Sequence, residues 1–115
     1  GEQIVDNPAQ AAYNLDVSTQ VPMREIYLTS GPSRLLHFGK REVELRHAPK
    51  WQLALGETPA GMAIRTIYYF GPRMTEYAAK KLRGALDEKV REELAGFSVP
   101  MPAWVAGVVK EIVHV

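Results

Sequence analysis

The sequence contains no cysteine, and this absence excludes several kinds of chemistry. Without thiols the chain forms no disulfide, binds no metal through thiolates and has no cysteine nucleophile. Its apolar runs fall well short of the roughly 20 residues that a membrane-spanning helix needs. Its first residues also lack the basic and apolar regions of a signal peptide. We therefore expect a cytoplasmic protein with no membrane partner.

Signatures of nucleotide-binding and hydrolytic enzymes are also missing. The sequence has no P-loop, no G-x-G-x-x-G and no G-x-S-x-G nucleophile elbow. Ser30 and Ser33 lie near His37 in the sequence, so a small hydrolase is a further alternative, although no carboxylate is placed to orient the imidazole. We expect a protein that is not an enzyme, with no catalytic residues and no cofactor.

Histidine is scarce, and a metal site needs several ligands that converge. The histidines are His37, His47 and His114. A two-residue hairpin loop at Gly39 and Lys40 would place His37 opposite Glu42 and make His47 project from the other face. A longer or bulged turn would change this pairing. We expect no metal site.

The chain has enough apolar material for one hydrophobic core. Its 115 residues, 46% of them hydrophobic, fit a single domain spanning 1–115. The net charge of +1 is too small to attract nucleic acid by itself. However, residues 1–19 hold three acids and no base, whereas residues 20–50 hold six bases and three acids. The basic excess therefore lies in one segment.

Strand and turn signals are concentrated in the first half of the chain. Asn7 and Pro8 are typical of a helix start, which predicts a short N-terminal helix over 8–15. Three strand-like segments follow: 23–29, 34–38 and 41–47. We expect them to form a small antiparallel β-meander. In the last of them Val43 and Leu45 alternate with charged residues, which indicates one packed and one solvated sheet face.

Helical periodicity dominates the second half. One helix is predicted between Thr58 and Gly71, and Thr75 is placed to cap the next. The amphipathic stripe of Leu86–Phe97 and the apolar stripe of Val105–Ile112 predict two more helices. Strands grouped early and helices grouped late predict an α+β fold with a C-terminal group of helices.

Short sequence words carry a family resemblance. The first is Ser18-Thr19-Gln20-Val21-Pro22, which ends the stretch from Asn7. The second is Tyr27-Leu28-Thr29-Ser30-Gly31-Pro32, which continues into Ser33 and Arg34. With the tail Pro102-Ala103-Trp104-Val105, these words resemble the body of a bacterial family of unknown function that is similar to the AbiEi antitoxins of abortive-infection toxin–antitoxin systems. The likeness spans nearly the whole chain.

The resemblance implies a non-catalytic antitoxin that neutralises a nucleotidyltransferase-like toxin, with or without a stable complex between the two proteins. It also implies a transcriptional regulator that binds operator DNA, because AbiEi-like proteins normally begin with a winged-helix domain. The sequence begins with Gly1 and includes no such domain. We expect either that a winged helix precedes this segment in the native protein, or that this member lacks one, in which case the DNA-binding implication weakens.

The basic segment predicts how DNA would be contacted in a full-length regulator. The winged helix would read bases, and this domain would add phosphate contacts on one flank. Strand alternation prevents all the bases of residues 20–50 from sharing one face. We predict Arg34, Lys40 and Arg41 as the DNA phosphate contacts, because they lie at turns or strand ends. The hydroxyls and amides of residues 27–34 are either part of an anion site or an ordinary hairpin turn.

An autonomous protein-interaction domain unrelated to toxins is the alternative function. In that case Trp104 and the apolar stripe of Val105–Ile112 bind a partner. The opposing interpretation is that the stripe fills the protein's own core, as its regular helical spacing suggests. Exposure of Trp104 and Val108 in one apolar patch would favour the partner, and full burial would exclude it.

Overall fold

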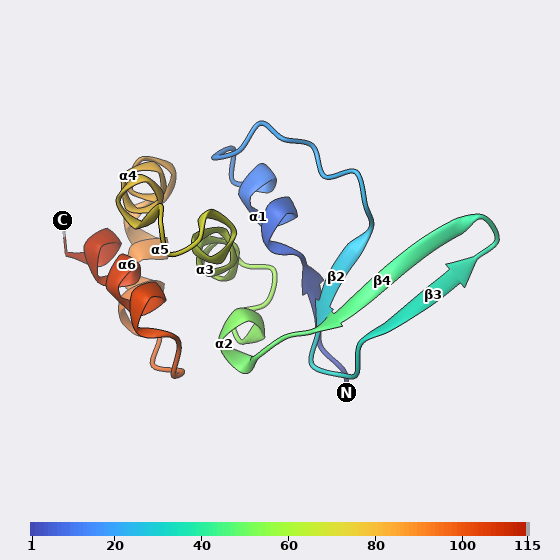
Figure 1. The fold of residues 1–115 in the computed structure, drawn as a ribbon. Helices are drawn as coiled ribbons and strands as arrows, with labels where there is room; N and C mark the ends of the chain where they lie inside the picture. Colours follow the sequence, from blue (N-terminus) through green and yellow to red (C-terminus); the bar gives the residue numbers. More distant parts are fainter. Residues whose placement is uncertain (115) are drawn as a thin grey trace.

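The protein consists of one four-stranded sheet and six helices in a computed structural model that describes residues 1–114 (Figure 1). The strands are β1 (Ile4–Asp6), β2 (Ile26–Thr29), β3 (Arg34–Phe38) and β4 (Arg41–His47). The sheet lies at one end of the molecule, and the last helices lie at the other. The predicted α+β class, with helices grouped toward the C-terminus, is therefore confirmed.

The predicted antiparallel meander is wrong in its strand order, which is β1-β2-β4-β3. β2 pairs with β4 in parallel, from Ile26 opposite Glu44 to Thr29 opposite His47. β1, which the sequence did not predict, pairs with β2 in antiparallel fashion. Only β3 and β4 form the expected antiparallel pair.

Burial explains this strand order. β4 has seven residues, enough to pair with a neighbour on each side, and its Val43 and Leu45 are buried. β3 instead leaves Leu35 and Phe38 more than half exposed, at 53% and 59%. A strand whose side chains are covered is stable inside a sheet, whereas an exposed strand is confined to the edge. The alternation of Val43 and Leu45 with charged residues did predict their burial correctly.

The segment before β2 also differs from the prediction. The strand expected over 23–29 begins only at Ile26, and Met23 is 91% exposed in the preceding loop. The helix expected over 8–15 is present as α1 (Pro8–Asn14), and the Asn7 side chain caps it by accepting a hydrogen bond from the backbone N–H of Gln10 at 3.0 Å.

β3 and β4 form a hairpin that projects from the body of the molecule, and we call residues 34–47 the hairpin arm (Figure 1). Gly39 has a φ of 66°, as the tight loop requires. The predicted register is confirmed, because His37 lies opposite Glu42.

The remaining helices are α2 (Lys50–Leu53), α3 (Pro59–Phe70), α4 (Thr75–Ala85), α5 (Glu88–Ala95) and α6 (Ala103–Val113). Short α2 was not predicted. Thr58 and Asp87 cap α3 and α5 by accepting hydrogen bonds from backbone N–H groups three residues on. Thr75 does not cap α4 as expected. The cap position is Met74, which makes no side-chain hydrogen bond.

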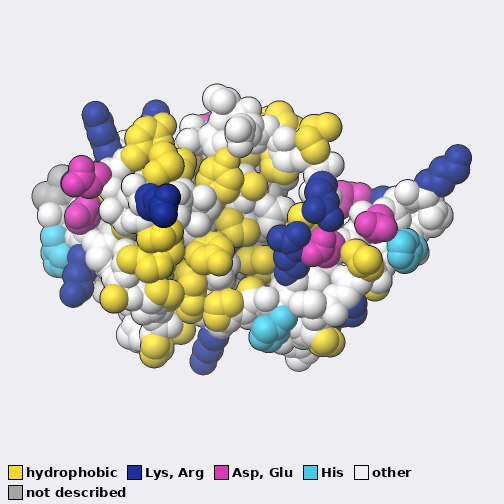
Figure 2. All heavy atoms as spheres, viewed as in Figure 1, with side chains coloured by type: hydrophobic (Ala, Val, Ile, Leu, Met, Phe, Trp, Pro, Cys, Tyr) yellow, Lys and Arg dark blue, Asp and Glu magenta, His cyan; other side chains and the backbone are white. Residues whose placement is uncertain are grey.

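Helices α3 to α6 enclose the main core. Its fully buried members include Ala63, Ile64, Ile67, Leu82, Leu94, Val105, Val108 and Ile112. A second, smaller cluster of Val5, Leu28, Ala48 and Leu53 joins the sheet to α2. On the face shown in Figure 2, apolar side chains gather over the helices, while charged side chains of both signs mix over the sheet. None of the helices within residues 1–114 is long and apolar enough to cross a bilayer.

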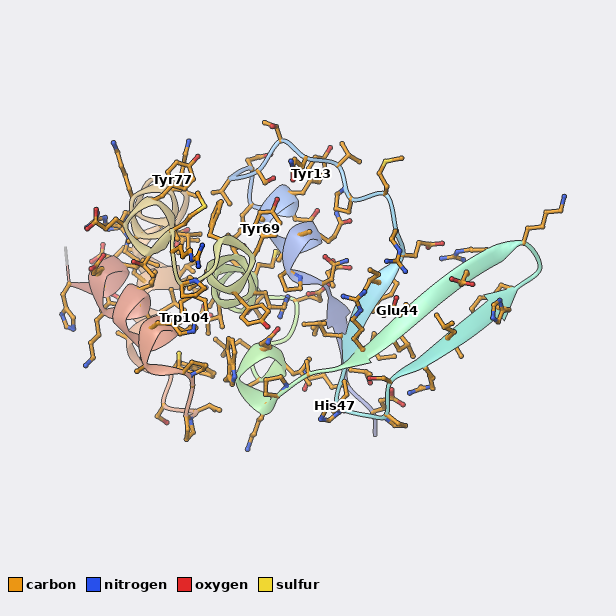
Figure 3. All side chains as sticks on the ribbon, in the orientation of Figure 1. Tyr13, Glu44, His47, Tyr69, Tyr77 and Trp104 are labelled. Carbon is orange, nitrogen blue, oxygen red and sulfur yellow. The ribbon has the colours of Figure 1, made fainter. Side chains whose placement is uncertain are left out.

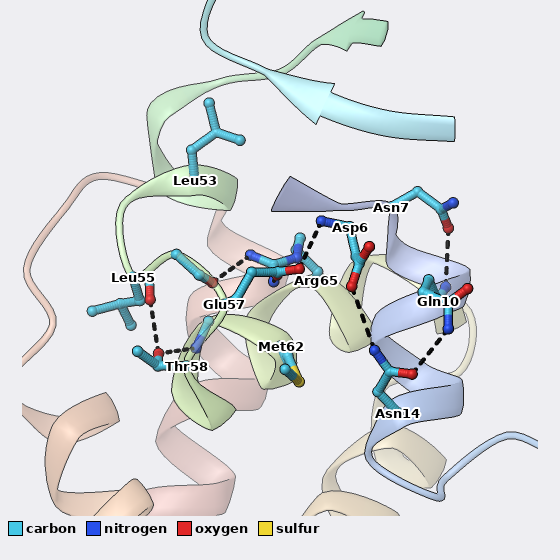
Figure 4. A network of polar contacts seen from close by, with 12 residues as sticks. Asp6, Asn7, Gln10, Asn14, Leu53, Leu55, Glu57, Thr58, Met62 and Arg65 are labelled. Atoms are coloured by element: carbon cyan, nitrogen blue, oxygen red, sulfur yellow. Dashed lines mark hydrogen bonds and ion pairs between the residues drawn. The ribbon is translucent and has the colours of Figure 1, made fainter. Parts of the chain in front are cut away.

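A buried arginine connects the two halves of the fold (Figure 4). Arg65, on α3, is fully buried and donates hydrogen bonds from Nη1 to the carbonyl oxygens of Gln52 and Gly56, each at 3.0 Å. Its Nη2 pairs with the carboxylate of Glu57. Glu57 also accepts a hydrogen bond from the backbone N–H of Asp6 at 3.1 Å. The arginine thus holds the loop after α2, and through Glu57 the end of β1.

Burial shifts the titration of both partners in this pair. It lowers the pKa of Arg65, although the carboxylate of Glu57 acts in the opposite direction. It also raises the pKa of Glu57, and the side chain of Asp6 adds to this rise, whereas the backbone N–H of Asp6 and the charge of Arg65 lower it. The guanidinium is fully buried, whereas the side chain of Glu57 is 43% exposed, so the pair lies at the boundary between the interior and the solvent.

Removing the guanidinium should destabilise the whole protein. We expect Arg65→Met to lower the free energy of unfolding by about 3 kcal/mol, because the substitution strands the buried carbonyl oxygens and leaves the carboxylate of Glu57 without its partner. Urea unfolding followed by circular dichroism measures the change. Arg73→Met, at an exposed arginine outside any helix, is the matched control. A loss below about 1 kcal/mol would contradict the central role of Arg65.

Candidate nucleic-acid interface

The three predicted phosphate contacts lie at opposite ends of the hairpin arm. Arg34 is at its base, opposite Leu45, whereas Phe38 lies opposite Arg41 next to the loop. Four residues of extended strand separate the two ends by about 14 Å. The structure therefore brings Lys40 and Arg41 together at the tip and does not bring Arg34 to them.

Arg34 is paired with a carboxylate from the start of the chain. Its Nη2 donates to Oε1 of Glu2 at 2.9 Å, and its Nη1 lies 2.9 Å from Oε2. The buried hydroxyl of Thr29 donates to the same carboxylate. A Cβ at Gly31 would lie only 2.6 Å from the carboxylate carbon of Glu2. The turn predicted as either an anion site or an ordinary hairpin turn thus does hold an anionic group, and that group belongs to the chain itself.

Arg41 has a carboxylate partner as well. Its Nε and Nη2 donate to the two oxygens of Glu25 at 2.6 and 2.5 Å, which is the bidentate geometry that arginine favours. Glu44, in the middle of β4, accepts from both Arg24 and Arg46. These ion pairs link the arm to the segment that precedes β2.

Hydrogen bonds from arginine lower the pKa of each of these carboxyls below the ordinary value of 4.5. The partner is Arg34 for Glu2, where the Thr29 hydroxyl assists, and Arg41 for Glu25. Arg46 has the same effect on the pKa of Glu44. The carboxylates are therefore charged at neutral pH, and the arginines beside them carry a compensated charge.

Pairing changes the meaning of the basic excess in residues 20–50. Four of the six bases have a carboxylate partner, and only Lys40 and Lys50 have none among residues 1–114. A phosphate would have to displace Glu2 or Glu25 to contact Arg34 or Arg41. Lys40, exposed at the tip of the arm, is the predicted contact that needs no such exchange.

The residues of the hydrolase alternative are separated in space. Ser30 accepts a hydrogen bond from the backbone N–H of Gln3, and Ser33 accepts one from the backbone N–H of His47, each at 2.8 Å. His37 instead faces Glu42 on the arm, 3.9 Å away. Neither Ser30 nor Ser33 is hydrogen-bonded to the imidazole of His37, which is the one that faces a carboxylate. Within residues 1–114, no three histidine or acidic side chains lie close enough to share a metal ion.

The apolar stripe of the interaction-domain alternative is part of the core. Val105, Val108, Val109 and Ile112 are all buried by α6 packing on its neighbours. Trp104 is half-buried and packs against the same core. The stripe therefore fills the protein's own interior, and of the features that motivated this alternative only the half-buried Trp104 reaches the surface.

Sequence reasoning missed two groups of aromatic side chains that form around the end of α3 with residues of α2, α4 and α6; Tyr69, Tyr77 and Trp104 are labelled in Figure 3. In one, Tyr68 stacks on Trp104 with ring centroids 6.3 Å apart and meets Trp51 edge-on at 5.8 Å. The other group consists of Tyr69, Phe70 and Tyr77, with the ammonium of Lys81 over the Tyr77 ring. The run Tyr68-Tyr69-Phe70 was the available signal, but helix periodicity alone does not show what lies beside it.

These observations define an α+β protein with a projecting, ion-paired hairpin arm. The chain belongs to the Family of unknown function (DUF6088), whose sequence model matches residues 2–94. The match covers the first two words of the resemblance and leaves out the tail at Pro102. No curated protein and no solved structure matches the chain.

Acid should loosen the hairpin arm. The pKa values of Glu2, Glu25 and Glu44 are lowered in the folded state, so their ion pairs add stability above pH 4.5, and this stability is lost as the pH falls through the lowered values. We expect amide protection factors of residues 34–47 to fall between pH 6 and pH 3 before those of α3 do. Hydrogen exchange followed by NMR measures this.

Two variants test the cause of the loosening. Glu25→Gln should loosen the tip of the arm already at neutral pH, whereas Glu93→Gln, at an exposed position of α5, should not. The ion pairs do not hold the arm if its protection factors fall only together with those of α3, or if Glu25→Gln leaves them unchanged.

Proposed function

We propose that this chain is the antitoxin domain of an AbiEi-like toxin–antitoxin regulator. In this role it neutralises a nucleotidyltransferase-like toxin without catalysis and assists the binding of operator DNA by the full-length protein. The proposal rests on the resemblance of the words Ser18–Pro22 and Tyr27–Pro32 to that family.

One structural observation supports the proposal. The residues of Ser18–Pro22 and of the turn Ser30–Ser33 are exposed or half-buried. Val21 is 60% exposed and packs into neither core cluster. Core packing does not dictate the identity of such residues, so this exposed part of the likeness is explained by a common partner, whereas the buried Leu28 and Thr29 of the second word are explained by a common fold.

The first test is neutralisation in the cell. The complete native gene is expressed in bacteria together with the neighbouring gene for the nucleotidyltransferase-like toxin, and colony survival is counted. We expect the complete gene to restore growth. We expect Val21→Asp to reduce survival about tenfold or more, because a charge in a partner-binding surface costs at least about 1.4 kcal/mol.

Met23→Asp is the matched control, since Met23 is even more exposed but lies outside the word. Both variants should accumulate and unfold like the wild type. Failure of the complete gene to restore growth, or the absence of such a neighbouring gene, would overturn the proposal. Equal survival with Val21→Asp and Met23→Asp would instead show that the surface of Ser18–Pro22 takes no part in neutralisation.

The second test concerns DNA. We expect Lys40→Ala to lower the slope of log affinity against log salt by about 0.9, since one phosphate contact is lost. The preferred operator sequence should not change. The triple change Arg34→Ala, Lys40→Ala and Arg41→Ala should lower the slope further only if phosphate displaces the carboxylates of Glu2 and Glu25.

Operator binding by the full-length protein across a salt series measures these slopes. Lys50→Ala is the control, because Lys50 is also a lysine with no carboxylate partner among residues 1–114 but lies outside the arm. An unchanged slope in both Lys40→Ala and the triple variant would show that the arm does not contact DNA.

A further inference from the structure

A surface cavity of about 420 Å³ lies between the end of the sheet and α3. Its wall comes from α1, β2, the end of β4, α2 and α3 and consists of Pro8, Leu28, Arg46, His47, Ala48, Pro49, Gln52, Tyr68 and Tyr69. Its volume falls within the range of about 300–1,000 Å³ that small-molecule sites occupy. Figure 3 shows Tyr69 on α3 and His47 at the end of β4, on different walls of this cavity.

One wall of the cavity offers an aromatic ring held in a fixed orientation. Tyr68 is 48% exposed, although its ring is fixed by stacking on Trp104 and by the edge contact with Trp51. Tyr69 is fixed by a hydrogen bond of 2.9 Å from its hydroxyl to the Gln20 side chain. Preoriented rings at a surface are suited to stacking on a planar ligand, because little conformational freedom is lost on binding.

The wall of the cavity includes a polar side chain, that of Gln52, whose amide has no hydrogen-bond partner in the described part of the chain. Gln52 is 6% exposed and lines the cavity, yet its side-chain amide makes no hydrogen bond with any group of residues 1–114. Only its backbone is engaged, since its carbonyl oxygen accepts from Arg65. The amide atoms are therefore open to the cavity, where they offer a ligand one donor group and one acceptor.

The remaining polar groups favour an anion. Arg46 uses Nε for Glu44, and its two terminal nitrogens have no partner among residues 1–114. His47 donates to the carbonyl oxygen of Gly31 from Nδ1 at 2.8 Å, so Nε2 is left for another contact, and it donates to an anion when the ring carries its second proton. No acidic side chain lines the cavity.

We propose that this cavity binds a nucleotide, with the base stacked on Tyr68 and the phosphate beside Arg46 and His47. Adenine is the best match for the base, because a glutamine amide pairs with both N6 and N7 of adenine. The site takes either a free nucleotide or one unit of a single-stranded nucleic acid, which present the same chemistry. The proposal does not rest on the antitoxin function, since it is argued from the side chains of Gln52, Tyr68 and Arg46, none of which belongs to the words Ser18–Pro22 and Tyr27–Pro32.

The test is titration of the purified chain with AMP, followed by NMR. We expect saturable shifts of the amide signals of residues 46–52 and 68–69. Tyr68→Ala should weaken binding about fivefold or more, because a base that stacks on an aromatic ring loses that contact. Gln52→Leu, which keeps the side-chain volume and removes the amide, should also weaken AMP but should weaken UMP less.

Tyr77→Ala is the matched control, because Tyr77 is an equally exposed tyrosine on α4 that does not line the cavity. It should bind AMP like the wild type. All variants are compared by thermal unfolding, so that a loss of folding is distinguished from a loss of binding. The absence of saturable shifts with both AMP and a single-stranded oligo(dA), or an equal loss in Tyr77→Ala and Tyr68→Ala, would overturn the proposal.

The source of the nucleotide is distinguished by two further titrations. Oligo(dA) that binds more tightly than AMP, with an affinity that falls as salt rises, would identify single-stranded nucleic acid as the ligand. AMP that binds as tightly as the oligomer would identify a free nucleotide. Binding of adenosine as tight as that of AMP would overturn the assignment of Arg46 and His47 as phosphate contacts.

Discussion

The buried guanidinium of Arg65 is the interaction on which the arrangement of the two halves depends. The sheet and the helical core bury separate apolar clusters, which are joined by the packing of α1 on α3 and by α2, whose Trp51 and Leu53 belong to different clusters. Arg65 reaches out of α3 to the backbone of Gln52 and Gly56 and to Glu57, which in turn holds Asp6. A single planar cation with several donors thus satisfies carbonyl groups that would otherwise be buried without partners.

The same arrangement shapes the cavity in which we place a nucleotide. Arg65 takes the carbonyl oxygen of Gln52, and this contact fixes α2 with the side chain of Gln52 in the cavity wall. Trp51, next to Gln52, lies in the main core and meets Tyr68 edge-on. Arg65 and Trp51, which belong to the interior of the protein, therefore also hold Gln52 and Tyr68 in position in the cavity wall.

In the hairpin arm, the charges of the arginines are compensated by neighbouring carboxylates. The sequence places six bases between residues 20 and 50, which alone would suggest a basic surface. In the fold, Glu2, Glu25 and Glu44 lie against four of the arginines. The arm is consequently a nearly neutral projection with a lysine at its tip, and a DNA-binding role for it rests on Lys40 more than on Arg34 or Arg41.

The sequence by itself determined the local structure. The helix starts at Asn7 and Thr58, the tight loop at Gly39 and the helical stripes are signals between residues a few positions apart. They predicted most helices, the hairpin register and the α+β class. Only the tertiary structure decided the strand order, the pairing of Glu2 with Arg34, and the union of Gln52, Tyr68 and Arg46 around one cavity. These features join positions that are distant in the chain. No periodicity or turn signal specifies which distant groups will meet. That choice depends on how the whole chain buries its apolar surface and satisfies its buried polar groups.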